Sequence, residues 1–210
     1  MKRIFRIVVL SGFLVAAALP SKGQEYFTMI TYDMSLPTGD YKDFIGDTSF
    51  RGWTLEGRWF TNDQVSFGLS FGWKIFHEKS SDLASFSLTD RTQGDVTGRR
   101  FSYVNSFPFL VNSHFYLGDE YGIRPYAGLG LGVSYTVQRF ELGVWQRNEN
   151  NFHFTLVPEV GFVVPVSYST SAILAARYNH AFKAGDYVTR NEFDLTYLSF
   201  VIGFAFSPDF

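Results

Sequence analysis

The chain has 210 residues, a formal net charge of −2, 19% aromatic residues, 18% charged residues and no cysteine. So many aromatic residues exclude an intrinsically disordered chain, and Leu, Ala, Glu and Lys do not dominate as they would in a helical bundle. The near-neutral charge gives no general attraction for nucleic acid, and a chain without cysteine has neither disulfides nor thiolate metal sites. The length corresponds to one domain.

The N-terminal segment has the three parts of a secretory signal peptide. Three basic residues precede an apolar run over residues 7–19, and the small residues Ser21 and Gly23 fit the positions that signal peptidase reads. The run is shorter than the roughly 20 residues that a membrane-spanning helix needs. We therefore expect residues 1–23 to be removed as a signal peptide, leaving residues 24–210 as one mature domain with a formal net charge of −6.

Eight later segments alternate apolar and polar residues with the period of a β-strand. The clearest alternation has Phe67, Leu69 and Phe71 on one face, with Gly68 and Ser70 on the other. The predicted strands are Tyr26–Leu36, Phe50–Phe60, Val65–His77, Phe101–Leu117, Ile123–Val137, Phe152–Val166, Ser171–Phe182 and Glu192–Phe206.

The predicted connections alternate between short turns and longer polar loops. The short turns are Thr61–Gln64, Gly118–Gly122 and Ser167–Thr170, and the longer loops are Pro37–Ser49, Glu78–Arg99, Gln138–Asn151 and Lys183–Asn191. Short turns at one end and long loops at the other are typical of transmembrane barrels, whereas a soluble sandwich has crossovers and scattered loop lengths. The strands also reach the 9–11 residues that a bilayer requires.

The two faces of the strands differ in kind. One face carries large apolar and aromatic side chains, and the other carries small residues, such as Gly128, Gly130 and Gly132 in one row, with isolated charges. An eight-stranded barrel is only wide enough inside for side chains, so its lumen requires small residues and a few bulky polar ones. The sequence therefore predicts an all-β fold, a closed eight-stranded antiparallel up-and-down transmembrane β-barrel, with its apolar face toward lipid.

Several stretches carry a family resemblance. The chain ends Phe204-Ala205-Phe206-Ser207-Pro208-Asp209-Phe210, and Arg124-Pro125-Tyr126-Ala127-Gly128-Leu129-Gly130 and Pro158-Glu159-Val160-Gly161 look like strand segments. With the signal peptide and the hairpin rhythm, the mature chain from about Tyr26 to Phe210 resembles the small eight-stranded outer-membrane barrels of the OmpA, OmpX and OmpW porin-like kind.

The resemblance implies a location and partners. It implies the outer membrane of a Gram-negative cell envelope and contact with outer-membrane lipid and lipopolysaccharide. It also implies assembly by the barrel-assembly machinery, which would read the terminal aromatic residue; because Pro208 interrupts the alternation, Phe206 is expected to be the last residue in register. No nucleic-acid partner is expected.

No residue pattern predicts a metal, a cofactor or a catalytic centre. The four histidines, His77, His114, His153 and His180, have no metal-ligand spacing, and His114 is expected to face the lumen near the short turns. The glycine row does not follow the dinucleotide-binding pattern. We therefore expect neither metal nor cofactor, and no enzymatic activity.

His180 is the one residue that suggests an enzyme. Outer-membrane barrels that deacylate lipid A use His, Ser and Glu late in the chain, and the predicted last loop brings Glu192 nearly opposite an outward-facing His180. The position two residues after His180, where that family has its serine, is Phe182. A lipid-A-modifying enzyme is therefore the third alternative only.

Inward-facing charges form the candidate site. The hairpin centred on Tyr168 should bring Glu159 directly opposite Arg177, and a charge inside a narrow barrel needs a hydrogen-bonded partner. We expect this ion pair to join a lumen network with Asp33, Glu56, Arg58 and Lys74. The pair either fills the lumen and fixes strand register, or acts as a gate.

The expected function follows from the architecture. The first hypothesis is a structural or surface-interaction barrel, adhesion-like, with an extracellular ligand bound through the loops. The alternative is a narrow channel for small or apolar solutes.

Overall fold

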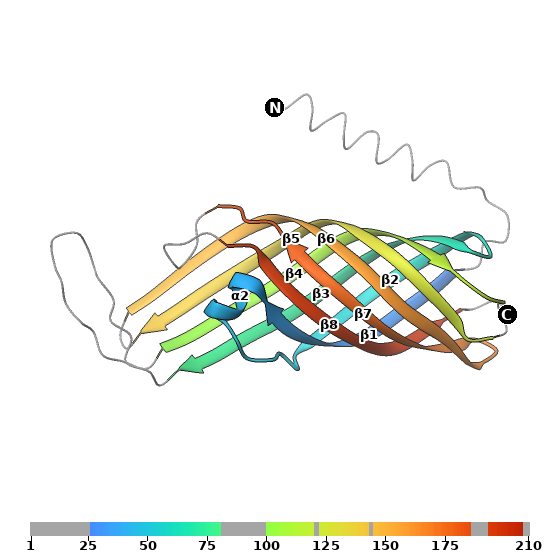
Figure 1. Cartoon of the computed structure of the whole chain (residues 1–210), viewed down its shortest axis with the longest axis horizontal. Helices are drawn as coiled ribbons and strands as arrows, with labels where there is room; N and C mark the ends of the chain where they lie inside the picture. The colour runs from blue at the N-terminus through green and yellow to red at the C-terminus, as the bar shows by residue number, and fades with distance from the viewer. Residues whose placement is uncertain (1–25, 81–99, 120–121, 143–144, 186–192, 208–210) are drawn as a thin grey trace, which may run out of the picture.

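The computed structural model is a closed β-barrel of eight antiparallel strands in sequence order, with the last strand paired to the first (Figure 1). The structure describes residues 26–80, 100–119, 122–142, 145–185 and 193–207, so the predicted signal peptide lies outside it. The elements are β1 (Tyr26–Thr38), α2 (Gly39–Phe44), β2 (Gly52–Asn62), β3 (Val65–Ser80), β4 (Arg100–Tyr116), β5 (Arg124–Leu142), β6 (Trp145–Ser167), β7 (Thr170–Ala181) and β8 (Leu195–Phe206). The predicted fold class is confirmed.

The alternation of side chains around the wall also follows the prediction. Large apolar side chains point outward and many remain about half exposed, as for Leu69 (56%), Val111 (59%) and Phe154 (55%). The intervening side chains point into the lumen and are buried. Closure gives every strand a partner on both sides, so the apolar belt surrounds a wall without an open edge. No helix in the described ranges is long and apolar enough to cross a bilayer.

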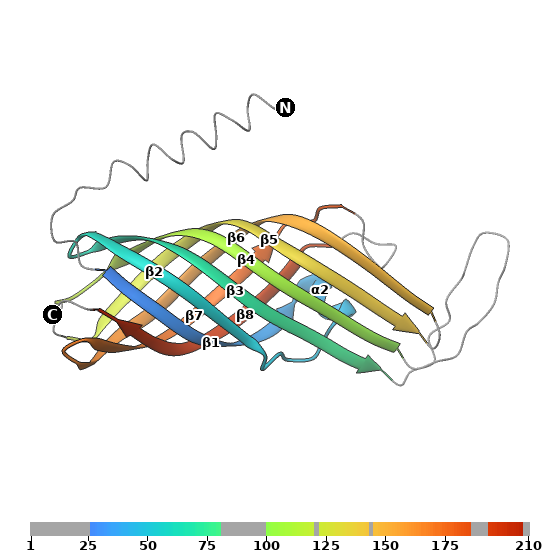
Figure 2. The same cartoon turned by 180° about the vertical axis from the view of Figure 1, so that it is seen from behind.

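The strands differ greatly in length, which corrects one prediction. The segment Gln138–Asn151 is not a loop, because β5 continues to Leu142 over 19 residues and β6 begins at Trp145 and has 23. The pairing continues through polar residues such as Arg139 opposite Asn148. Cross-strand bonding therefore overrides the weak strand propensity of this segment. β3 to β6 extend well beyond the ends of the other four strands (Figures 1 and 2).

The first long connection is also more structured than the sequence predicts. The expected loop Pro37–Ser49 begins as strand, turns at Gly39 with a φ of 55°, and forms the short helix α2. It then returns along β1 through a bridge between Ser35 and Ser49. The predicted loop Glu78–Arg99 falls mostly outside the described residues. At the other end of the barrel, the tight turns after β2 and β6 are present as expected, and β8 ends at Phe206.

The lumen contains two apolar layers that the sequence analysis did not predict. Near the short turns, Phe27, Met29, Phe60, Tyr116, Tyr126, Val163, Ile173 and Ala205 form one cluster. At the opposite end, Tyr41, Phe44 and Ile45 of α2 and its C-cap pack on Phe76, Val104, Ala181, Phe193, Leu195 and Tyr197. The expectation that only small and polar residues fill the lumen is therefore wrong. At Gly161, for example, an added Cβ would lie 2.9 Å from Cε1 of Tyr126, so an aromatic ring uses the space that this glycine leaves open.

Candidate functional site

All six charged residues that the sequence analysis assigned to the lumen lie inside the barrel. Asp33, Glu56, Arg58, Lys74, Glu159 and Arg177 have exposed fractions of 0%, 2%, 0%, 3%, 7% and 6%. They project inward from β1, β2, β3, β6 and β7, which are brought together only by closure of the wall. Together with their neighbours they form a polar layer between the two apolar clusters.

Glu159 and Arg177 form the centre of this layer. They are register partners on β6 and β7, as the hairpin geometry predicts. The Arg177 Nε donates to Glu159 Oε2 at 2.5 Å, and its Nη2 donates to Glu56 Oε2 at 3.1 Å. Arg177 thus joins carboxylates from opposite parts of the wall.

Arg58 closes the arrangement from the other side. Its Nε donates to Glu56 Oε1 at 2.8 Å and its Nη2 donates to Glu159 Oε1 at 3.0 Å. Two arginines and two glutamates therefore alternate, each arginine contacting both carboxylates. Such charge-assisted, partly bidentate contacts are the strong ones in a buried site. The four charges cancel.

Two tyrosines attach this ring to the apolar cluster at the short-turn end. Arg58 Nη1 donates to the hydroxyl of Tyr116 at 2.9 Å, and the hydroxyl of Tyr126 donates to Glu159. The guanidinium of Arg58 also lies 4.8 Å from the centre of the Tyr126 ring. The rings belong to the apolar layer while their hydroxyls belong to the ionic one, so the two layers are continuous.

Lys74 and Asp33 form a second, smaller pair toward the end with α2. Their side chains make a direct ion pair, and Thr54 hydrogen-bonds to both of them. Lys74 Nζ donates to Thr54 Oγ1 at 2.8 Å, and that hydroxyl donates to Asp33 Oδ2 at 2.6 Å. This pair is neutral as well. The expected network is therefore two neutral groups in one layer.

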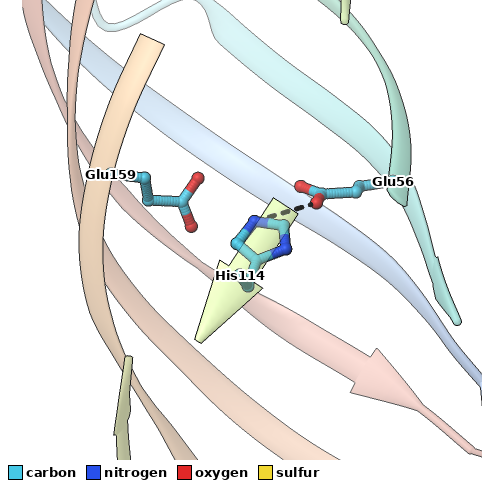
Figure 3. A group of neighbouring side chains, drawn as sticks. All are labelled: Glu56, His114 and Glu159. Carbon is cyan, nitrogen blue, oxygen red and sulfur yellow. Dashed lines mark ion pairs between the residues drawn. The ribbon is translucent and has the colours of Figure 1, made fainter. Parts of the chain in front are cut away.

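His114 belongs to the same site and faces the lumen near the short turns, as expected (Figure 3). Its Nε2 lies 3.5 Å from Glu56 Oε1, and its ring fits only because position 128 on β5 is glycine. A Cβ at Gly128 would lie 2.4 Å from His114 Cδ2. The sequence showed that these glycines make room inside the barrel but not which side chain uses it.

Glu56, His114 and Glu159 come close enough together to resemble a metal site. All four carboxylate oxygens already accept hydrogen bonds, from Arg58, Arg177 and Tyr126 among others. A divalent cation would have to displace a guanidinium and would add charge to a buried group that is already neutral. The donor set therefore suits the two arginines better than a metal ion.

Little free volume remains in the polar layer. A cavity of about 20 Å³ is bordered by Lys74, Asn112, Glu159 and Arg177. This volume is room for about one water molecule. Apolar side chains pack above and below this layer.

His180 lies apart from the lumen. It faces outward near the end of β7, as predicted, and its Nε2 is 3.2 Å from Asp194 Oδ2. The expected partner Glu192 lies outside the described residues. The ring of Phe182 is 4.3 Å from that of His180, so the place of a nucleophile is occupied by an apolar side chain.

The comparison with known proteins rests on structure. No family model and no curated protein sequence matches the chain. OprG from Pseudomonas aeruginosa has a TM-score of 0.58 and 15% identity, over 90% of this chain and 98% of that one. Neisserial surface protein A has a TM-score of 0.55 and 12% identity, over 88% of this chain and 99% of that one. Ail of Yersinia pestis, in complex with the heparin analogue sucrose octasulfate, has a TM-score of 0.51 and 14% identity, over 89% of this chain and 99% of that one.

These matches cover nearly the whole of each relative, so the shared feature is the complete barrel. At such low identity the likeness concerns the fold. The resemblance expected from the sequence is confirmed at this level: the chain has the fold of the small eight-stranded outer-membrane β-barrels.

Proposed function

We propose that the protein is a non-enzymatic outer-membrane barrel with a closed lumen, which acts through its outer surface. The location is supported by the continuous belt of exposed apolar side chains, including Phe67, Phe109 and Ile202, which a bilayer would cover. The long strand ends would face outside and the short turns the periplasm. Contact with lipopolysaccharide and assembly by the barrel-assembly machinery are parts of the same proposal.

The filling of the lumen carries this proposal. A conducting barrel needs an aqueous path, whereas here an ionic layer is held between two apolar layers. Moving a solute through it would require breaking the buried pairs of Arg58 and Arg177 with both glutamates. Leaving such charges unpaired is strongly unfavourable, so the interior serves to stabilise the barrel.

The wall formed by the long ends of β3 to β6 is the surface best placed to meet a partner. It continues beyond the other strands and displays polar side chains such as Gln146, Asn148 and Asn150. A structure of the similar barrel Ail, the attachment invasion locus protein of Yersinia pestis, holds a heparin analogue. We therefore propose an adhesion-like role in which an extracellular ligand contacts this wall.

The first experiment is planar-bilayer conductance of the refolded protein. We expect no stable open state for the unmodified barrel. A defined, steady conductance would instead support the narrow-channel alternative. If only Arg177→Met or Glu159→Gln conducts, the ion pair acts as a gate rather than as a filler.

The second experiment tests the wall. Replacing residues 139–148 with an Asn-Gly turn shortens the β5–β6 hairpin while leaving Gln138 opposite Glu149. Bacteria displaying this variant should bind a cultured epithelial monolayer less than bacteria displaying the unmodified protein at equal surface amounts. Equal binding would reject the wall as the interaction surface.

The enzyme alternative has little support in the described residues. His180 pairs with Asp194, but Phe182 lies beside it where a nucleophile would be needed. Mass spectrometry of lipid A from cells with and without the protein tests this. We expect identical acylation patterns, and a lost or added acyl chain would restore the enzyme hypothesis.

A further inference from the structure

A group of basic side chains lies on the outward face of β2 to β5, at the end where the strands are long. Arg51, His77, Lys79 and Arg139 are all exposed and point away from the lumen. The strand register makes them neighbours. His77 lies opposite Tyr103, which in turn lies opposite Arg139. We refer to Arg51, His77, Lys79 and Arg139 as the basic patch.

The patch begins where the apolar belt ends. Arg51 directly precedes β2 and is two residues beyond the outward-facing Trp53, and on β3 His77 is four residues beyond Trp73. The indole nitrogen of Trp73 donates to Asn105 Oδ1 at 3.1 Å, so polar contacts begin directly above this ring. At about 3.3 Å per residue along a tilted strand, the patch lies roughly 5–15 Å beyond Trp53 and Trp73, with Lys79 the farthest. That is the depth of lipid headgroups.

Among the described residues, only Arg139 of the basic patch has an acidic partner. Lys79 Nζ lies 5.7 Å from the centre of the Phe101 ring. Arg139 pairs with Glu141, which is the one acidic side chain among the described outward positions of β2 to β5 at this level. Further around the wall, the described outward positions of β6 at this level include Asn148 and Asn150, and His180 on β7 contacts Asp194.

The positive charges are separated in a way that suits two anionic groups. Lys79 and His77 are on β3 and Arg139 is on β5, two strands away, which places them roughly 10 Å apart across the sheet. The ring of Tyr103 lies between them, tilted by 40° from the His77 ring with the two ring centres 5.5 Å apart. A headgroup with two phosphates joined by a flat, sugar-like spacer matches this arrangement better than a single phosphate does.

We propose that the basic patch binds the diphosphorylated glycolipid anchor of lipopolysaccharide in the outer leaflet, one phosphate near Lys79 and the other near Arg139. This rests on the orientation proposed above, in which the long strand ends face outside. Each exposed basic residue near a membrane surface contributes a modest attraction to anionic lipid, and several together select it. The bound lipid would border the root of the protruding wall.

The test uses the refolded full-length barrel in neutral detergent micelles, titrated with diphosphoryl lipid A. The variant Lys79→Ser/Arg139→Ser should bind at least about tenfold more weakly than the unmodified protein. The variant Glu141→Gln should bind more tightly, because it removes a competing carboxylate. Monophosphoryl lipid A should bind more weakly than the diphosphoryl form and should respond less to the double substitution.

The matched control is Lys42→Ser/Lys183→Ser, which removes the same charge from exposed positions on α2 and after β7. It should leave lipid A binding unchanged. If the control and the patch variant lose the same amount of lipid A affinity, the loss comes from the lower net charge, and the proposal is overturned. Equally tight, patch-dependent binding of phosphatidylglycerol would also overturn it, because a single phosphate would then suffice. Neither result bears on the conductance or adhesion tests.

Discussion

The glutamates and arginines of the ionic layer cannot be treated as independent pairs. Arg177 and Arg58 each contact both Glu56 and Glu159, so removal of any one of these charges takes an ion-pair partner from two others. In a buried group the cost of an unpaired charge exceeds the gain from the pair itself. The layer is therefore sensitive to single substitutions and more tolerant of neutral double ones.

A double-mutant cycle tests this at the Glu159–Arg177 pair. Glu159→Gln and Arg177→Met should each lower the free energy of unfolding by about 3–5 kcal/mol, and the double variant by less than their sum. The measurement is the urea midpoint of refolded barrels, with the slope checked for constancy. The exposed pair Arg139–Glu141 is the control, where a coupling energy near zero is expected. Zero coupling at Glu159–Arg177 would reject the buried pair.

The fit between Gly128 and His114 gives a second prediction at this scale. In Gly128→Ala the new methyl group would overlap the imidazole, which lies 2.4 Å from the Cβ position, and should cost about 1–3 kcal/mol of stability. Adding His114→Ser should recover part of that loss by vacating the space. Gly122→Ala, where the nearest atom is 3.8 Å away, should be neutral. Failure of the second substitution to rescue the first would show that the ring is not what limits position 128.

Among the elements, β3 best shows how one strand serves two environments. Leu69 is 56% exposed and faces the surroundings of the barrel, while the adjacent Gly68 faces the lumen, where a Cβ would lie 2.8 Å from the carbonyl oxygen of Gly57. Because side chains alternate along a strand, one of two adjacent residues faces lipid and the other faces the packed interior. The same substitution should therefore fail for different reasons at the two positions.

Arginine substitutions along β3 test this orientation. Leu69→Arg should lower the free energy of unfolding in lipid by about 2–4 kcal/mol if the residue lies near the bilayer midplane. His77→Arg, on the same face beyond the belt, should have little effect. Gly68→Arg should prevent correct closure through steric overlap. Urea titration of barrels refolded in vesicles gives the comparison, and a Leu69→Arg barrel as stable as the unmodified one would contradict the assigned lipid face.

The helix α2 has a role that its length would not suggest. Tyr41 is 1% exposed and meets the ring of Phe76 edge-on at 5.3 Å, so a six-residue helix helps to close one end of the lumen. The backbone nitrogen of Gly46 also donates to Glu78 on β3, which ties the returning segment to the wall. The first long connection is thus part of the barrel interior.

The molecule as a whole is asymmetric along its axis, with tight turns at one end and a projecting wall at the other. The chain contains no cysteine, so single introduced thiols report sidedness without background. In intact cells a membrane-impermeant maleimide should label Asn148→Cys on the wall but not Asp63→Cys in a short turn. Permeabilised cells should show both labelled. The reverse pattern in intact cells would invert the topology and remove the basis for the lipid A proposal.

The sequence by itself determined the barrel. Apolar and small residues alternated along every predicted strand, and a lipid-covered wall has no other way to satisfy its backbone than to close. Hairpin arithmetic alone also brought Glu159 opposite Arg177, because antiparallel register is set by the turn. These features depend on neighbours along the chain or across one hairpin.

The tertiary structure decided what lies inside. Phe27, Phe60, Tyr116 and Tyr126 sit at inward positions that could be counted from the sequence, but their meeting as one layer depends on strand offsets around the whole barrel. The same holds for His114 beside Glu56 and for Tyr41 of α2 on Phe76. The sequence pattern also did not predict the length of β5 and β6, because polar residues in a long ladder are stabilised by the partner strand and not by their own strand propensity. Period-2 alternation tells which face a residue occupies, and only closure tells which residues share its level.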